Sequence, residues 1–407
     1  MVTRHKLHRV KNNINIVSLY LFAIKLSRLD KFDFQPWHSL KIRAVALNWH
    51  QHKPTNLNKK NMTKSFLTFP SLLLLCSLLF CAISCSKGKA QEEPIIENGK
   101  KDTIKTIALE EKKISAIDTV DYNNRLLALS NNDTTGFWPV KKPYPLPGAV
   151  LPYNRIIAFY GNLYSKRMGI LGELPKEEML KKLQDEVAKW QAADPTIKAI
   201  PALHYIAVTA QSLPGKANLH RMRMPFKQID TVLNWAKSID ALVFLDVQVG
   251  HSNIKNEVTS LETYLKLPNV HLGIDPEFSL KNGHIPGTKI GTFDAEDIND
   301  AIDILTNLVR ENNLPPKVLV VHRFTQGMVT NYKNIKIVPE VQVVMDMDGF
   351  GDKILKRSTY LRYIYKEPVQ FTGFKLFYKN DNKNNWKMYL PEELLKFTPK
   401  PIYIQYQ

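Results

Sequence analysis

Short apolar segments alternate with helix-periodic segments from residue 155 to residue 407, and this alternation constrains the fold more than any other feature of the chain. Eight apolar segments have the length and composition of strands: residues 155–160, 200–209, 241–249, 270–278, 317–324, 341–347, 369–377 and 401–406. Six segments between them have the apolar spacing that is typical of helices: residues 175–192, 226–239, 254–267, 294–313, 351–365 and 391–397. Such alternation predicts parallel strands joined by crossover helices.

Eight strands are the number needed for a closed (β/α)8 barrel, the TIM-barrel fold. Residues 242–245 and 318–321 are continuously apolar, as expected of strands that are covered on both faces. An open doubly wound sheet is the alternative, but no Gly-rich phosphate loop follows the first strand. We therefore predict an α/β barrel domain over residues 138–407.

Polar residues follow the apolar stretches at the ends of most of these strands. In a barrel, the carboxyl ends of all strands meet at one rim, and active sites lie there. The residues predicted to bind substrate at this rim are Tyr160, Gln211, Gln248, His322, Phe324, Asp348, Lys375 and Gln405. A single Asp after a strand is usually a helix cap, but acidic residues recur at the ends of the third, fourth and sixth strands. This recurrence favours a functional site.

Asp275 and Glu277 end the fourth predicted strand with one proline between them. If the strand continues through both, its alternation places the two carboxylates on the same side. Neighbouring carboxylates raise each other's pKa, so one of them can stay protonated near neutral pH. Glycosidic cleavage needs such a proton donor and a second carboxylate. We predict Glu277 as the acid, Asp275 as the group that tunes its pKa, and Asp246 or Asp346 as a further catalytic partner.

The Asp275-Pro276-Glu277 sequence resembles the end of the signature of the chitinase-type, family 18 glycoside hydrolases. The sequence Met345-Asp346-Met347-Asp348 on the sixth strand is similar to the Met-x-Tyr-Asp region of that family. The resemblance implies that Glu277 is the acid and that the substrate's acetamido group is the nucleophile. Over residues 155–407 the chain resembles bacterial (Bacteroidetes-type) lipoproteins with a TIM-barrel domain, which implies a fold and a cellular address but no reaction.

Aromatic residues at or just past the strand ends favour a sugar substrate, because flat rings can stack on pyranose faces. These residues are Tyr160, Tyr164, Phe278, Phe324, Phe350 and Phe377. The predicted loop 211–225 is long enough to cover a substrate, and its His220, Arg221 and Arg223 would suit an anionic sugar or remain in solvent. The expected partner is a polysaccharide, a cell-wall glycan or another extracellular polymer.

Two other functions are compatible with the same residues. A barrel without catalytic activity would bind glycans through hydrogen bonds from the acids to sugar hydroxyls. A metal-dependent hydrolase would use the rim acids and His322 as ligands for Mg²⁺ or Ca²⁺, although no His-x-His or His-Glu-x-x-His pair is present. An enzyme that forms a Schiff base on Lys375 is a more distant alternative. We predict no metal site and no cofactor.

A secretory signal is predicted over residues 62–85. The basic start Met62-Thr63-Lys64 is followed by the apolar segment 65–80 and by small residues before Cys85. Ala82-Ile83-Ser84-Cys85 resembles a bacterial lipobox, which implies that Cys85 is lipidated and becomes the mature N-terminus. We expect a protein of the cell envelope, anchored to the membrane by this lipid, with its domain in the periplasm or outside the cell. A plain transmembrane anchor is the alternative.

Two further segments complete the predicted organisation. Residues 1–61 have no clear period and are expected to be an upstream translation artefact, while the polar residues 86–137 are expected to form a linker. The formal charge of +18 does not indicate nucleic-acid binding, because residues 1–84 hold 13 Lys and Arg against 2 Asp. Cys76, Cys81 and Cys85 all lie in the signal segment, so the barrel has no cysteine for a disulfide or a thiol nucleophile.

Overall fold

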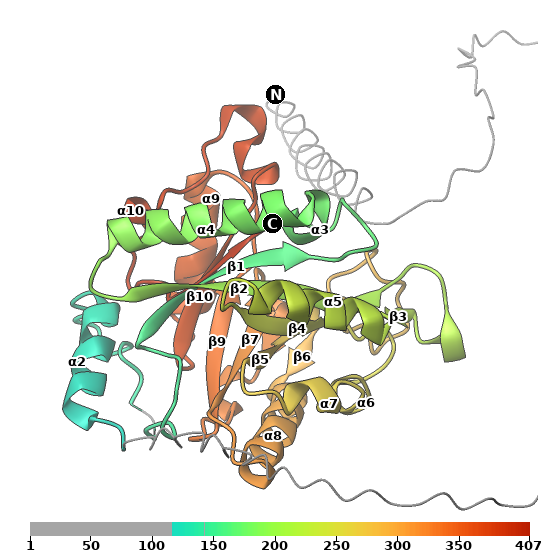
Figure 1. Ribbon diagram of the computed structural model, residues 1–407, viewed down its shortest axis with the longest axis horizontal. Coiled ribbons are helices and arrows are strands. Elements are labelled where there is room, and N and C mark those ends of the chain that lie inside the picture. Colours follow the sequence, from blue (N-terminus) through green and yellow to red (C-terminus); the bar gives the residue numbers. More distant parts are fainter. Residues whose placement is uncertain (1–115, 142) are drawn as a thin grey trace, which may run out of the picture. The chain divides into compact units, whose positions relative to one another are not determined.

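Eight parallel strands form a closed barrel in the computed structural model, which describes residues 116–141 and 143–407 (Figure 1). In order around the barrel they are β1 (Asn154–Gly161), β2 (Lys198–Ala210), β4 (Leu242–Val247), β5 (Val270–Ile274), β7 (Lys317–Arg323), β9 (Val341–Met347), β10 (Phe371–Leu376) and β11 (Tyr403–Tyr406). Ile156 of β1 lies opposite Ile200 of β2 on one side and Tyr403 of β11 on the other, which closes the barrel. The predicted (β/α)8 fold is confirmed.

Helices pack on the outside of the strands (Figure 1). They are α3 (Ile170–Glu173), α4 (Lys176–Ala193), α5 (Phe226–Lys237), α6 (Ile254–Thr259), α7 (Glu262–Leu265), α8 (Ala295–Glu311), α9 (Lys353–Tyr360) and α10 (Pro391–Leu394). Short 3₁₀ helices are η2 (Lys216–Asn218), η3 (Pro276–Phe278), η4 (Gln326–Met328), η5 (Tyr332–Asn334) and η7 (Asn380–Asn385), and the π-helix η6 (Leu361–Tyr365) continues α9. No helix in the described part of the chain has the length and apolar character needed to cross a membrane.

The predicted helix at residues 254–267 is divided into α6 and α7. At the division, the Leu261 N–H donates to the carbonyl of Val258 at 2.9 Å, three residues back, and the Ser260 hydroxyl donates to the Glu257 carbonyl at 2.7 Å. These bonds replace the regular pattern of the α-helix. The other five predicted helices are confirmed, with small shifts of their ends.

The final part of the predicted linker is a packed helix. Helix α2 (Thr119–Ser130) begins after Asp118, whose side chain accepts hydrogen bonds from the N–H groups of Val120 and Asp121. Leu129 on this helix is buried in the apolar cluster that includes the inner residues of the barrel. For residues 119–130 the structure therefore shows a docked helix where the sequence predicts a tether. The structure does not describe residues 1–115. The predicted translation artefact (residues 1–61), the signal segment with Cys85 and the first part of the predicted linker (residues 86–115) all lie in this region.

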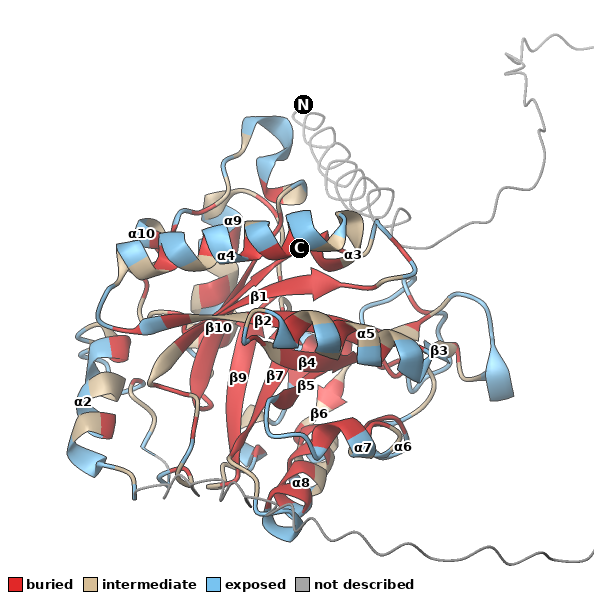
Figure 2. Cartoon of the chain, viewed as in Figure 1, coloured by how far each residue is buried: buried red, intermediate tan, exposed pale blue. Residues whose placement is uncertain are grey.

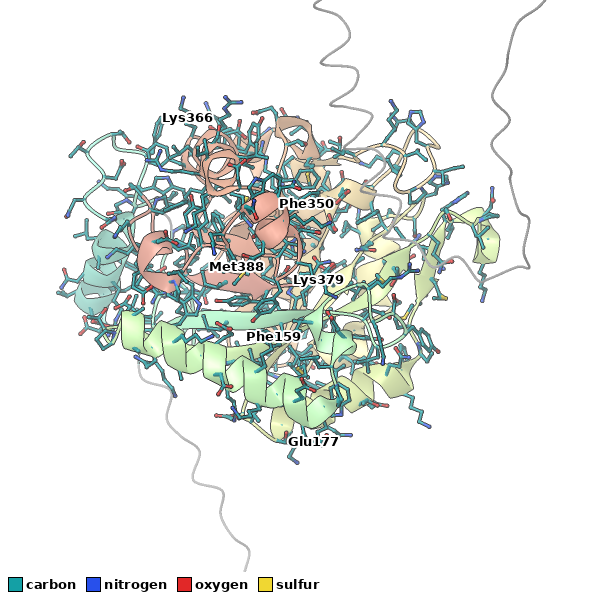
Figure 3. The ribbon with its side chains drawn as sticks, turned by 90° about the horizontal axis from the view of Figure 1, so that it is seen from above. Phe159, Glu177, Phe350, Lys366, Lys379 and Met388 are labelled. Carbon is teal, nitrogen blue, oxygen red and sulfur yellow. The ribbon has the colours of Figure 1, made fainter. Side chains whose placement is uncertain are left out.

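The apolar core has two parts. The larger part lies between the strands and the surrounding helices; Figure 3 shows Phe159 of β1 on the barrel side of α4 and Glu177 on its outer side. The smaller part fills the interior of the barrel and includes Ala202, Phe244 and Val320. The strands are buried almost throughout, while the outer faces of α4 and α5 are exposed (Figure 2).

Three short strands in the described part of the chain lie outside the barrel. β3 (Arg221–Arg223) pairs in antiparallel fashion with the end of β2, and β6 (Phe293–Asp294) pairs with β8 (Val329–Thr330). β3 turns part of the predicted loop 211–225 into a β-hairpin with β2. This hairpin extends the wall of the barrel at the carboxyl ends of the strands.

Candidate active site

A cavity of about 200 Å³ opens at the carboxyl ends of the barrel strands. Six of the predicted site residues line it: Tyr160, Gln211, Gln248, Asp275, Asp348 and Lys375. Four others, Asp246, His322, Asp346 and Gln405, are fully buried in the interior of the barrel. Glu277 and Phe324 do not line the cavity. The structure therefore separates the predicted residues into a cavity lining and a buried polar network.

Asp275 is the member of the predicted acid pair that lines the cavity. β5 ends at Ile274, and Asp275 is the cap of η3, accepting a hydrogen bond from the Glu277 N–H at 3.0 Å. The prediction that the strand continues through residue 278 is wrong, because Pro276 starts a helical turn there. Glu277 therefore does not share a strand face with Asp275. Glu277 is buried, with 8% of its surface exposed, and it does not line the cavity.

The environment of Asp275 favours its protonated form. Burial raises the pKa of this carboxyl group, and the nearby charges of Glu277, Asp348 and Asp246 raise it further, whereas His322 lowers it. The result is a pKa of about 8. Asp275 is thus mainly a carboxylic acid at neutral pH, able to donate a proton to a molecule in the cavity.

Asp348 and Lys375 form an ion pair in the same cavity. The Lys375 ammonium lies 3.1 Å from both carboxylate oxygens of Asp348, and it sits 3.9 Å from the centre of the Tyr160 ring. Asp348 follows the end of β9, and Lys375 belongs to β10, so neighbouring strands hold the pair together. The cavity therefore contains a protonated acid and a second, cation-paired carboxylate.

Asp246 is the centre of the buried polar network beneath the cavity. Its Oδ2 accepts a hydrogen bond from the Tyr160 hydroxyl at 2.9 Å, and its Oδ1 lies 3.2 Å from His204 Nε2 and 3.4 Å from His322 Nε2. Burial would raise the pKa of Asp246, but the contacts with His204 and His322 outweigh it and keep the pKa below its usual value. Burial lowers the pKa of His204 to about 4.

The second centre of this network is His322. Its Nδ1 lies 3.2 Å from Asp346 Oδ2 and 3.4 Å from Asp348 Oδ2. Burial opposes the charged imidazolium, yet contacts with Asp246 and Asp346 raise the pKa of His322 well above its usual value. Burial in turn raises the pKa of Asp346. Asp246 and Asp346, which were predicted as catalytic partners, thus lie below the cavity and do not line it. Asp246 influences the cavity by raising the pKa of Asp275.

His204 is the main site residue that the sequence analysis missed. It lies in the middle of β2, where an apolar run hides it, and its Nδ1 is 2.5 Å from the Tyr403 hydroxyl and 3.2 Å from Gln405 Nε2. The signal that would have found it is its alternation with Ala202 and Ile206, which places all three side chains on one face of the strand. A polar residue on the inner face of a barrel strand requires a polar partner.

Two glycines make room for the buried acids. Gly273 of β5 is the register partner of Asp246, and Gly373 of β10 is the partner of Asp346. A Cβ atom at residue 273 would overlap His204 Nε2 and would lie 2.5 Å from Asp246 Oδ1. Glycine within these strands is therefore a packing requirement of the polar network.

We expect Gly273→Ala to destabilise the protein by about 1 to 3 kcal/mol, since the added methyl group overpacks the interior. Gly327→Ala is the matched control, because a Cβ there would meet nothing within 4 Å. Urea denaturation of both variants measures the difference. Equal midpoints for the two variants would show that the interior has room that the structure does not indicate.

The walls of the cavity are mainly apolar. They include Met168, Ile206, Leu213, Met222 and Met224. Among the aromatic residues predicted at the rim, Tyr160, Tyr164 and Phe278 line the cavity, and Phe324, Phe350 and Phe377 do not. The lining thus combines apolar and aromatic side chains with charged and amide groups, which is the usual composition of a small-molecule site.

The β2–β3 hairpin covers one side of the cavity through Leu213 and Met222, but its arginines face elsewhere. Arg221 Nε and Arg223 Nε lie 2.8 and 2.7 Å from the two carboxylate oxygens of the buried Glu257. His220 packs against His251 with ring centres 4.3 Å apart. The arginines therefore fix the hairpin to α6. Their contacts do not support the predicted binding of an anionic sugar.

One group of the described residues has the composition and spacing to hold a metal ion. It consists of His204, Asp246 and His322, whose possible ligand atoms all lie within 4.8 Å of one another. The sequence analysis predicted no metal site, since these three residues come from strands β2, β4 and β7 and share no local motif. The group lies in the polar network beneath the cavity.

Comparisons with known proteins found only distant similarity to solved structures. No protein-family model matches the chain, and no curated protein matches it. Similar solved structures include the spore cortex-lytic enzyme SleL of Bacillus megaterium QM B1551, with 12% identity, a TM-score of 0.30, and coverage of 68% of this chain and 64% of that chain. The chain thus spans 64% of the length of that enzyme.

Two others are glycan-degrading enzymes by name. The Bacillus subtilis mannanase BCman has 12% identity, a TM-score of 0.34, and coverage of 72% of this chain and 86% of that chain. A hyperthermophilic endo-β-1,4-glucanase in complex with substrate has 8% identity, a TM-score of 0.29, and coverage of 51% and 77%. TM-scores of this size establish neither a common function nor a common family.

Proposed function

We propose that this protein is a glycoside hydrolase that acts on a polysaccharide or a cell-wall glycan, with Asp275 as its general acid. The observation that carries the proposal is the position of Asp275: a carboxyl group with a pKa of about 8 that lines a cavity at the carboxyl ends of the barrel strands. Asp348, which lines the same cavity, is the second carboxylate that the reaction requires.

The chemistry follows from these two groups. Asp275 transfers its proton to the glycosidic oxygen as the bond from that oxygen to the anomeric carbon breaks. Asp348 either takes a proton from the water that attacks the anomeric carbon or attacks that carbon itself. In the second route a glycosyl ester forms, and water that gives its proton to the Asp275 carboxylate then hydrolyses the ester and frees Asp348. Lys375 neutralises the charge of Asp348 and keeps its carboxylate in a fixed place, 3.1 Å from the ammonium. Tyr160 and Phe278 offer flat faces for a sugar ring.

The assignment of the acid differs from the one implied by the resemblance to family 18 glycoside hydrolases. That resemblance gives the proton to Glu277, whose side chain lies outside the cavity lining. Asp275 takes the role here because it is both in the cavity and mainly protonated at neutral pH. Substrate assistance by an acetamido group is therefore no part of the proposal.

A panel of polysaccharides and peptidoglycan, incubated with the purified protein, tests the proposed function. Release of reducing ends from at least one glycan is the expected result, and it should persist after chelation. Binding of a glycan without release of reducing ends would instead support a glycan-binding barrel without catalytic activity. Cleavage that stops on chelation would support a metal-dependent hydrolase.

We expect glycan cleavage to decline as the pH rises through about 8, since Asp275 is then deprotonated and cannot act as an acid. Below that pH the acid form predominates, so this limb of the profile stays flat toward neutral pH. The charged groups that act on Asp275 are Glu277, Asp348, Asp246 and His322. The profile should be measured on chelated protein, because a bound cation would lower the pKa. An alkaline limb near pH 4 to 5 would contradict the role of Asp275.

We also propose that lipidated Cys85 anchors the domain to the membrane of the cell envelope. The proposal is supported by the apolar segment 65–80 and the lipobox-like residues before Cys85. Mass spectrometry of the native protein is the test. A mature chain that begins at Cys85 and carries lipid is expected, whereas peptides from residues 1–60 or an unmodified Cys85 would contradict it.

A further inference from the structure

We infer that His204, Asp246 and His322 form a binding site for one divalent transition-metal ion in the interior of the barrel. The three side chains come from β2, β4 and β7 and are fully buried. Their nearest ligand atoms are His204 Nε2, Asp246 Oδ1 and His322 Nε2. This inference goes beyond the proposed function and holds whether or not the protein cleaves glycans.

The distances between these atoms fit the edges of a metal-coordination polyhedron. His204 Nε2 and His322 Nε2 lie 3.2 and 3.4 Å from Asp246 Oδ1. The distance at His322 is longer than a normal N–H···O hydrogen bond of about 2.7 to 3.2 Å, and the distance at His204 is at the upper limit of that range. Ligands held about 2.0 to 2.1 Å from a tetrahedral ion lie about 3.3 Å from each other. The observed spacing is thus that of two edges of a coordination tetrahedron.

The buried atoms of His322 support the same conclusion. Neither ring nitrogen of His322 makes a hydrogen bond of acceptable geometry to any described residue, nor does either carboxylate oxygen of Asp346. Buried polar atoms without a partner are costly, so nearly all of them have one in folded proteins. A metal ion next to Nε2 would provide that partner for His322.

His204 is also oriented as a metal ligand is. Its Nδ1, the nitrogen that does not face Asp246, makes a hydrogen bond with the Tyr403 hydroxyl at 2.5 Å, while His322 Nδ1 faces Asp346 Oδ2 at 3.2 Å without a hydrogen bond of acceptable geometry. Metal-bound histidines usually have such a partner on the other ring nitrogen, which fixes the orientation of the ring. Tyr160 likewise fixes the Asp246 carboxylate by donating to Oδ2 at 2.9 Å.

The donor set indicates which ions would bind. Two imidazole nitrogens and one carboxylate oxygen suit Zn²⁺, Co²⁺ or Fe²⁺ rather than Mg²⁺ or Ca²⁺, which prefer oxygen ligands. Three protein ligands leave one tetrahedral position for a water molecule. The site would tie three barrel strands together directly beneath the cavity.

Titration of the full chain with Zn²⁺ alone and with Co²⁺ alone, after removal of metal by a chelator, tests the site. We expect one equivalent of either ion to bind, visible absorption from tetrahedral Co²⁺, and a Tm that rises with the concentration of free Zn²⁺. If neither ion binds stoichiometrically and the Tm does not change, the inference is wrong, and the three residues only form histidine–carboxylate contacts. These readouts do not depend on glycan cleavage, so failure of the proposed function would not affect them.

Two variants locate the ion. His322→Gln should lose the stoichiometric binding, whereas His251→Gln should keep it, since His251 belongs to the separate pair with His220 near the surface. Loss of binding in His251→Gln with retention in His322→Gln would place the ion at the surface and contradict the inference. If His322→Gln does not fold, the Co²⁺ spectrum of the His251→Gln variant still decides between the two locations.

Discussion

Asp275→Asn should reduce the rate of glycan cleavage by about 10²- to 10⁴-fold, the usual contribution of a general acid. Asparagine has the same shape and can still accept the hydrogen bond from the Glu277 N–H, which is 3.0 Å from Asp275 Oδ1 in the structure. It has no acidic proton, however. The fold should therefore be retained while the chemistry is lost, as measured by release of reducing ends together with a circular dichroism melt.

Glu277→Gln is the matched control for this prediction. It changes the neighbouring carboxyl group, which is buried but does not line the cavity. We expect a rate close to that of the wild-type protein. The opposite pattern, with loss in Glu277→Gln and full activity in Asp275→Asn, would restore the assignment made from the sequence and refute the one made from the structure.

Asp246→Ala should destabilise the protein by about 3 to 5 kcal/mol, the usual effect of removing one partner from a buried charged network. The change leaves the Tyr160 hydroxyl, His204 and His322 without their shared acceptor in the barrel interior. Urea denaturation of chelated protein measures the loss, and chelation ensures that a bound ion does not contribute to it. The midpoint should fall without a change in the slope of the transition.

Asp303→Ala provides the comparison for an exposed acid. Asp303 pairs with Lys336 at 2.7 Å, but both side chains are about half exposed. Exposed pairs of this kind contribute about 0 to 1 kcal/mol. If Asp246→Ala were no more destabilising than Asp303→Ala, the polar network would not be a supporting element of the barrel.

The fold could be predicted from the sequence because strands covered on both faces are continuously apolar. All eight predicted strands are present, and β9 has the predicted bounds. The alternation of strands and helices then leaves few topologies other than the barrel. The convergence of the strand ends on one cavity follows from that topology, which is why Tyr160, Gln248, Asp348 and Lys375 lie together in its lining.

The depth of each side chain could not be predicted in the same way. Residues that end neighbouring strands lie at different heights, since barrel strands are tilted and staggered. Asp246 and Asp346 are one layer below the cavity, whereas Asp348 and Lys375 lie in its lining. β5 ends at Ile274 and Pro276 begins η3, so the strand alternation that paired Asp275 with Glu277 does not apply there.

The sequence alone also could not show which residues of distant strands contact each other. His204 is 42 residues from Asp246 along the chain, and the two meet only because β2 and β4 are neighbours in the closed barrel. Without the register, a histidine within an apolar run gives no sign of its partner. The predicted lipid anchor at Cys85 belongs to residues that the structure does not describe, and it stays a prediction.

A crystal structure of the Asp275→Asn variant with an oligosaccharide that the wild-type protein cleaves would test the central claim most directly. We predict a sugar bound in the cavity with its glycosidic oxygen about 2.6 to 3.2 Å from the side chain at position 275 and its anomeric carbon facing Asp348. An oligosaccharide bound with its scissile bond next to Glu277, or bound outside the cavity, would contradict the account.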